Sequence, residues 1–178
     1  MSSVETGASP PLFAAFSETE RWVVVHTRPR CEKKLADAAR RAGAVVYLPL
    51  QSKTHHYGAR ERTFSSPLFA GYVFCRGDIA LRQWLRQNQH TANLLEVVDQ
   101  AALAAQLQQL HALLAAGSLV EVMPFLESGR RVRVKSGPLR GLEGIVVRVH
   151  GTARVVVNID MIRQAAAVEV DSATLAPV

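Results

Sequence analysis

The last third of the chain alternates apolar with polar residues in several short runs, and glycines interrupt these runs at close intervals. Valine and isoleucine recur at every second position after Arg130, with glycines at 137, 141, 144 and 151 between the runs. A two-residue period belongs to strands with one buried face, and glycine permits the tight turns that short strands need. Residues 129–178 are therefore expected to form a small closed or nearly closed β-barrel.

Residues 21–117 show a different pattern, in which short β-branched runs alternate with helical periods. Strands are predicted at 22–26, 44–50, 66–75 and 94–98, and the polar stretch at 51–66 is expected to form an exposed hairpin or extended loop. Helices are predicted from Pro29 to Gly43, from Asp78 to Asn88 and from Asp99 to Gly117, because proline and aspartate favour helix starts and glycine favours helix ends. The predicted fold class is α+β: an α/β sandwich over 21–117, a linker at 118–128, the barrel, and a disordered tail at 1–20.

The helical periods also predict which side chains face the sheet, since each helix should bury one apolar stripe. These side chains are Cys31, Leu35, Ala38 and Ala42 in the first helix, Leu81, Trp84 and Leu85 in the second, and Leu103, Leu107, Leu110 and Leu114 in the third.

Positive charge is concentrated near the N-terminal end. The chain carries a net charge of +6, and the segment from Arg21 to Arg62 alone holds ten Lys or Arg against three Asp or Glu. Such a segment favours an anionic partner such as nucleic acid, and a solvated helix face with a polar hairpin explains it equally well.

The sequence carries no pattern of an enzyme or a metal protein. It has no glycine-rich phosphate loop after a strand, no carboxylate pair at a useful spacing and no nucleophile with a matching histidine and acid. Cys31 and Cys75 lie far apart without a CxxC motif, so neither a structural zinc nor a disulfide is expected. No catalytic residue, cofactor or metal is predicted. No apolar run approaches the roughly 18 residues of a membrane span, so a monomeric cytoplasmic protein is expected.

Two segments resemble known motifs in a known order. The segment from Gly129 to Val149, GRRVRVKSGPLRGLEGIVVRV, resembles the KOW motif in its glycines and alternating valines. The stretches WVVVHTRPRCEKKLADAARRAG, VVYLPL and SPLFAGYVFC resemble the NGN domain of the NusG family. The resemblance runs from Arg21 to the C-terminus. The basic HHYGARER hairpin and the divergent spacer resemble most the specialised RfaH-like or LoaP-like members of that family.

The resemblance implies a transcription elongation or antitermination factor. Its NGN domain would dock on the clamp helices of the largest subunit of bacterial RNA polymerase and would suppress pausing or termination. The positions that match the docking surface are His26, Arg28, Arg30, Phe69, Tyr72 and Phe74. Plain core packing is the alternative for Phe69 and Phe74, and strand alternation is expected to prevent these aromatic residues from all facing one way.

The resemblance implies two further contacts. Five basic side chains of the hairpin would touch the non-template DNA strand: Lys53, His55, His56, Arg60 and Arg62. Four apolar residues of the KOW domain would bind termination factor Rho or a small-subunit ribosomal protein: Leu139, Leu142, Met161 and Ile162. Burial inside the barrel is the alternative for these four. The competing functional hypothesis is a ribosomal or RNA-binding KOW protein.

Overall fold

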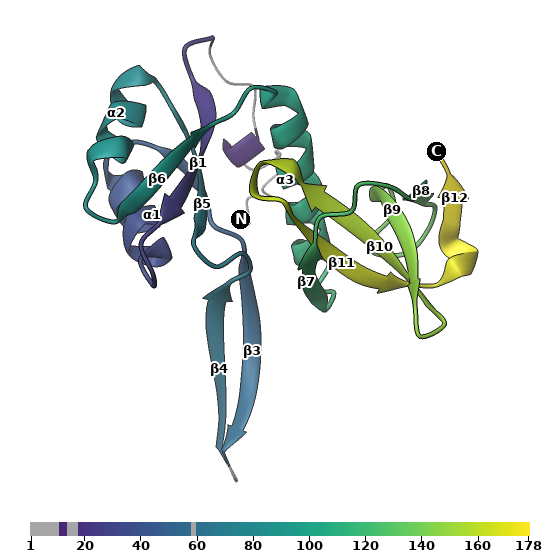
Figure 1. Cartoon of the computed structure of the whole chain (residues 1–178). Helices are drawn as coiled ribbons and strands as arrows, with labels where there is room; N and C mark the ends of the chain where they lie inside the picture. The colour runs from purple at the N-terminus through teal and green to yellow at the C-terminus, as the bar shows by residue number, and fades with distance from the viewer. Residues whose placement is uncertain (1–10, 14–17, 58–59) are drawn as a thin grey trace, which may run out of the picture.

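The computed structural model describes residues 11–13, 18–57 and 60–178. Its N-terminal unit is built on a four-stranded antiparallel sheet with the order β2-β5-β1-β6. The elements are β1 (Arg21–Thr27), α1 (Glu32–Arg41), β2 (Val45–Tyr47), β5 (Tyr72–Gly77), α2 (Ile79–Gln87), β6 (Thr91–Glu96) and α3 (Gln100–Ala115). This arrangement confirms the predicted α+β class (Figure 1).

Both faces of this sheet are buried, which explains the run of valines in β1. Val23 and Val25 point to the face covered by α1 and α2, and Trp22 and Val24 point to the opposite face, which packs on α3. Because successive residues of a strand point to opposite faces, a strand covered on both sides needs apolar residues at every position. The WVVV run meets that need.

Two predicted helix faces were wrong in detail. In α1 the buried residues are Glu32, Leu35, Ala36 and Ala39, so the buried face is turned from the predicted stripe. The reason is the Glu32 carboxylate, which accepts a hydrogen bond from the backbone N–H of Gly71 at 2.8 Å and so can be buried. In α2, Leu81 and Leu85 are buried as predicted, but Trp84 is 36% exposed. Leu81 and Leu85 lie one turn apart and define the packed face, and Trp84 lies beside it.

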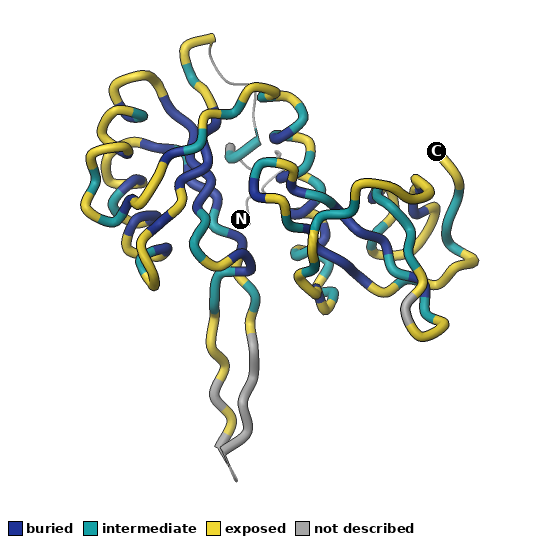
Figure 2. Tube along the Cα trace, viewed as in Figure 1, coloured by how far each residue is buried: buried dark blue, intermediate teal, exposed yellow. Residues whose placement is uncertain are grey.

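The strands β3 (Leu50–Tyr57) and β4 (Arg60–Pro67) form a long two-stranded hairpin. Their antiparallel register runs from Leu50 opposite Pro67 to Tyr57 opposite Arg60. The hairpin projects well away from the rest of the molecule (Figure 1), and its described residues beyond the base are exposed (Figure 2).

The C-terminal unit is a six-stranded antiparallel sheet with the order β12-β8-β9-β10-β11-β7. Its strands are β7 (Val120–Pro124), β8 (Arg130–Val134), β9 (Glu143–Val149), β10 (Thr152–Ile159), β11 (Gln164–Val170) and β12 (Leu175–Pro177). Residues 118–128, where we expected a linker, include β7. This strand pairs with β11 and buries Val120, so it is part of the sheet.

Gly144 shows why the glycines of the C-terminal unit were a useful signal for closely packed strands. A Cβ atom at Gly144 would lie 2.4 Å from the carbonyl oxygen of Val156 and 2.8 Å from a Val155 methyl carbon. Real side chains do not reach such distances, so β9 can lie this close to β10 only with glycine at this position.

One continuous hydrophobic core joins the two units, and we refer to it as the shared core. It contains Trp22, Phe69 and Phe74 of the N-terminal unit, the α3 leucines, and Val155, Ile159 and Ile162 of the C-terminal unit. The buried residues accordingly extend from the first sheet through α3 into the second sheet (Figure 2). The described residues also include the 3-10 turns η1 (Pro11–Phe13), η2 (Asp160–Ile162) and η3 (Ser172–Thr174). The first of these lies within residues 1–20, the segment expected to be a disordered tail.

Candidate functional site

His26 and Tyr72 form an aromatic pair on the surface of the first sheet. They are direct partners in the antiparallel pairing of β1 with β5, and their rings stack with centroids 5.2 Å apart and an angle of 26° between the planes. His26 is exposed and Tyr72 is half-buried against the shared core. Arg28 and Arg30 follow β1 and are exposed. This group presents stacked rings beside two cations at one end of the sheet.

Phe69 and Phe74 lie on the same side of the sheet, but they are buried. Phe69 is 1% exposed and Phe74 is 0% exposed, and both belong to the shared core with Leu103 of α3. The expectation that alternation would separate Phe69 from Phe74 was wrong. Phe69 lies in the turn before β5 begins, where Gly71 has a φ of +85°, so the two-residue period does not govern its direction.

Glu32 and Gly71 explain how this turn is held. The Glu32 carboxylate lies at the start of α1 and accepts the N–H of Gly71, and the N–H of Thr27 donates to the carbonyl of Gly71 at 2.8 Å. Both the N–H and the carbonyl of Gly71 are thus hydrogen-bonded. These bonds fix the turn that carries Phe69 to β1 and α1.

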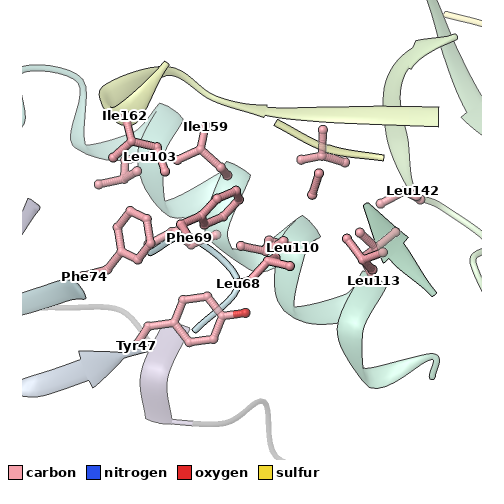
Figure 3. Close-up of a cluster of buried hydrophobic side chains, with 14 of the residues drawn as sticks. Tyr47, Leu68, Phe69, Phe74, Leu103, Leu110, Leu113, Leu142, Ile159 and Ile162 are labelled. Atoms are coloured by element: carbon pink, nitrogen blue, oxygen red, sulfur yellow. The ribbon is translucent and has the colours of Figure 1, made fainter. Parts of the chain in front are cut away.

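The four KOW residues predicted to bind a partner also pack in the shared core. Leu142 and Ile162 are 5% and 6% exposed, and Leu139 and Met161 are half-buried against the same core. Figure 3 shows Ile159 and Ile162 beside Leu103 and Phe69, and Leu142 beside Leu113. Side chains that were expected to form two separate binding surfaces therefore pack in one core, together with the leucines of α3.

Polar side chains of α3 fasten this contact. The Nε2 of Gln106 donates to Asp160 Oδ2 at 2.8 Å, and the N–H of Asp160 donates to Gln106 Oε1 at 3.2 Å. One turn away, the N–H of Glu143 donates to Gln109 Oε1 at 2.8 Å. At the base of the hairpin, Gln51 Nε2 donates to the carbonyl oxygen of Val120 at 2.7 Å.

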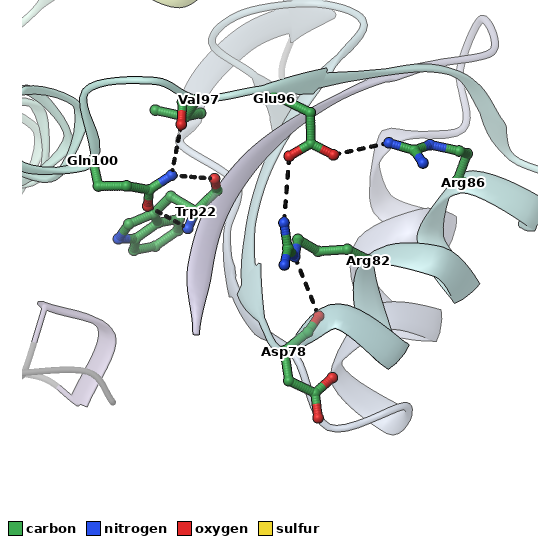
Figure 4. Close-up of polar contacts among 7 residues, drawn as sticks. All are labelled: Trp22, Asp78, Arg82, Arg86, Glu96, Val97 and Gln100. Carbon is green, nitrogen blue, oxygen red and sulfur yellow. Dashed lines mark hydrogen bonds and ion pairs between the residues drawn. The ribbon is translucent and has the colours of Figure 1, made fainter. Parts of the chain in front are cut away.

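Gln100 ties α3 to the first sheet in the same way. Its Oε1 accepts the N–H of Trp22 at 2.6 Å, and its Nε2 donates to the carbonyl oxygens of Trp22 and Val97 at 2.9 and 3.0 Å (Figure 4). On the other side of the sheet, Arg82 and Arg86 of α2 both pair with Glu96 of β6 (Figure 4). Exposed pairs of this kind contribute little to stability.

The hairpin holds the predicted nucleic-acid contacts. The backbones of Lys53, His55 and His56 lie in β3 and those of Arg60 and Arg62 in β4, with His55 opposite Arg62. The side chains of these five residues lie outside the described part of the structure.

The described residues offer little to a metal or to covalent chemistry. No group of three or more His, Cys, Asp or Glu among them could hold a metal ion. Both cysteines are free, and burial raises the pKa of the Cys75 thiol to about 12, which keeps it protonated and unreactive. No helix in the described ranges is long and apolar enough to cross a membrane.

Comparison with known proteins decides the family. A family model described as "NusG: Transcription termination factor nusG" matches residues 20–111, which is more than half of the chain. The chain belongs to the NusG family. No curated protein matches it. A similar solved structure is titled "Domain interaction in Thermotoga maritima NusG"; it is 16% identical, the match covers 89% of this chain and 97% of that one, and the TM-score is 0.46.

NusG family membership indicates a factor that acts in transcription elongation or termination. Four residues that hold the elements together were not predicted from the sequence: Gln100, Gln106 and Gln109, which fasten the two units, and Glu32. A signal for the first three was present, because α3 carries no Asp, Glu, Lys or Arg over its whole length. A surface helix normally has a charged face, so a helix without one is expected to be covered on more than one side.

Proposed function

We propose that this chain binds bacterial RNA polymerase through the face of the first sheet that carries His26, Phe69, Tyr72 and Phe74, and that it suppresses pausing or termination. The clamp helices of the largest subunit are the proposed partner, because a helix laid against an apolar surface is a common mode of recognition. Arg28 and Arg30 lie beside this face and would pair with acidic residues of the partner. The family assignment supports the general role.

The observation that carries the proposal is the mutual burial of the two expected binding surfaces in the shared core. Ile159 and Ile162 of the C-terminal unit are members of the same core as Phe69 and Phe74. Apolar surface of this kind is covered when it is not engaged by a partner.

The covered surface also supports an operon-specific role. A factor whose docking residues are covered must separate its two units before it binds polymerase. A signal can act on that separation. Such a step suits a regulator of selected operons better than a factor that joins every polymerase. After opening, the C-terminal unit would present Leu139, Leu142, Met161 and Ile162 to Rho or to a small-subunit ribosomal protein, and the hairpin would reach the non-template DNA strand.

The second candidate is an RNA-binding KOW protein, and the charge on the C-terminal unit favours it. Arg130 and Arg148 are exposed basic side chains on the same face of the neighbouring strands β8 and β9, because Arg130 lies opposite Val146, two residues before Arg148. Such a patch attracts RNA through its phosphates.

Single-round transcription with purified bacterial RNA polymerase tests the proposal. The wild-type chain should shorten pauses, and Tyr72→Ala should require about tenfold more protein for the same effect, because truncating a central aromatic at an interface costs on the order of 1 to 2 kcal/mol. Phe125→Ala is the matched control. Phe125 lies outside both surfaces, with its ring 4.0 Å from the Arg163 guanidinium carbon, so its loss should not change pausing.

Two results would count against polymerase docking. One is equal activity of wild type and Tyr72→Ala in a protein that remains folded. The other is the absence of polymerase binding together with tight, salt-dependent RNA binding by the full chain, which would favour the RNA-binding candidate.

A further inference from the structure

The turn Pro11–Phe13 places one phenylalanine inside a group of three aromatic rings. The Phe13 centroid lies 6.5 Å from that of Trp22, 5.7 Å from that of Tyr47 and 5.5 Å from that of His111. Tilted and edge contacts at these distances are favourable aromatic geometries. The three rings come from β1, β2 and α3, so Phe13 contacts both the sheet and the helix that covers it. We call Trp22, Tyr47 and His111 the aromatic cage.

The backbone of the same turn is also bound. Nη1 of Arg76 donates to the carbonyl oxygen of Leu12 at 3.3 Å. Arg76 is only 5% exposed, its guanidinium lies 5.6 Å from the centre of the Trp22 ring, and it pairs with Glu20 at 3.7 Å. A cation held in this way is a fixed donor. The cage therefore combines a pocket for one ring with a donor for the preceding carbonyl.

The turn is a small unit with little packing of its own. Leu12 and Phe13 are half-buried against the shared core, and one turn of 3-10 helix gives no independent stability. Residues 14–20 tether it to β1. A short tether gives an effective concentration on the order of millimolar, so even a weak contact is filled within one chain. Pro11 directly precedes Leu12, and a proline lowers the conformational entropy that a segment loses when it becomes ordered.

We propose that the aromatic cage is a binding site for a short proline-preceded apolar segment, that the chain's own Pro11–Phe13 is its occupant, and that this occupant fastens α3 to the sheet. His111 lies on the same helix as Gln106 and Gln109, which hold the C-terminal unit. Filling the cage therefore strengthens the closed arrangement of the whole chain. The inference concerns binding within the chain and does not depend on polymerase docking.

The test uses the full chain in a Trp84→Phe background, which leaves Trp22 as the single tryptophan of the protein. Phe13→Ala should shift the emission of Trp22 and lower the melting temperature by roughly 2 to 4 °C. A peptide of residues 9–15, SPPLFAA, added to the Phe13→Ala chain should restore the emission in a saturable way, with half-saturation on the order of millimolar. The same peptide with alanine for phenylalanine should not.

A control variant tests whether the loss of any apolar side chain gives the same result. Leu119→Ala removes an apolar side chain that is 89% exposed and should change neither emission nor melting temperature. Unchanged emission and melting temperature in Phe13→Ala would overturn the inference. So would equal effects of the two peptides, or a lower melting temperature that the wild-type peptide does not reverse, because Phe13 would then be an ordinary packing contact.

Discussion

Glu32 is a buried carboxylate whose hydrogen-bond partner lies in the turn before β5. Its position fixes the direction of α1 and, through Gly71, the turn that carries Phe69. A charged group is retained in such a place only when a partner compensates its desolvation. The sequence could not reveal this role, because Glu32 lies in the segment RPRCEKK, which has the pattern of an ordinary charged helix start.

Glu32→Ala should destabilise the protein by about 1 to 3 kcal/mol, because it leaves the Gly71 N–H without its acceptor. Glu32→Gln should cost less, since the amide oxygen can still accept that N–H. Urea denaturation of the two variants measures the difference. Equal unfolding free energies for Glu32→Ala and Glu32→Gln would show that the hydrogen bond does not fix the turn.

Cys75 should make the unfolding free energy depend on pH above about pH 9. Burial raises the pKa of its thiol from 9.0 to about 12 in the folded chain. Between these values the unfolded chain loses a proton that the folded chain keeps, so the unfolding free energy falls as pH rises, by about 1.4 kcal/mol per pH unit for one group. Below about pH 9 the thiol is protonated in both states and contributes no slope.

Urea unfolding of the wild type and of Cys75→Ala, from about pH 8 to about pH 10.5, isolates this contribution. The wild type should lose stability faster than the variant above about pH 9. Parallel curves would mean that the thiol ionises as readily in the folded chain as in the unfolded one. Burial raises the pKa of Tyr47 in the same direction, and Tyr47 is present in both proteins, so its effect cancels in the comparison.

The helix α3 is the element that connects the first sheet to the second. Its buried leucines at 103, 107, 110 and 113 lie in the shared core, and Gln100 binds the backbone of β1 at its start. The pairing of β1 with β6 starts at Val23, so Trp22 has no partner residue in β6. Gln100 binds the N–H and the carbonyl oxygen of Trp22 that this pairing leaves out. Gln100 thus acts as a side-chain substitute for the next strand residue.

Gln100→Ala should lower the unfolding free energy by about 1 to 3 kcal/mol, because two backbone groups of Trp22 lose their partner. It should also speed amide hydrogen exchange at Trp22 and in the first turn of α3. Asn88→Ala, which removes a side chain that accepts the N–H of His90 in its own loop, is the comparison variant. Exchange at Trp22 that is the same in Gln100→Ala as in the wild type would contradict this role.

The helices and strands of each unit were easier to predict from the sequence than the packing of the two units against each other. Strand and helix types followed from local periods, and Gly144 and the alternating valines identified the second sheet. The shared core could not be predicted, because Phe69, Ile162 and Leu142 are equally compatible with an exposed binding surface and with burial. The leucine stripe was predicted at 103, 107, 110 and 114, whereas the structure buries Leu113 and leaves Leu114 half-buried. The partner on the other side of the stripe is brought there only by the tertiary fold.

At the scale of the whole molecule, the arrangement depends on a contact that a few polar groups can alter. The shared core gives the contact its apolar area, and the Gln106–Asp160 pair sets its alignment at an exposed edge. We propose that the two units are the regions 21–117 and 120–178, with α3 bound to both. Separation of these units would uncover Phe69 and Ile162 together, so opening must cost free energy in the absence of a partner.

Gln106→Glu should favour the open arrangement, because it places a carboxylate against Asp160 and removes the amide donor. Like charges in contact at a partly exposed site cost on the order of 1 kcal/mol, which increases the open population about fivefold. If the covered face binds polymerase, the apparent affinity for polymerase should rise by the same factor, and small-angle scattering should show a larger radius of gyration. The double variant Gln106→Glu/Asp160→Asn restores a donor and an acceptor and should return both values to those of the wild type. An unchanged affinity in Gln106→Glu, together with a measured increase in the radius of gyration, would show that the covered face is not the surface that limits binding.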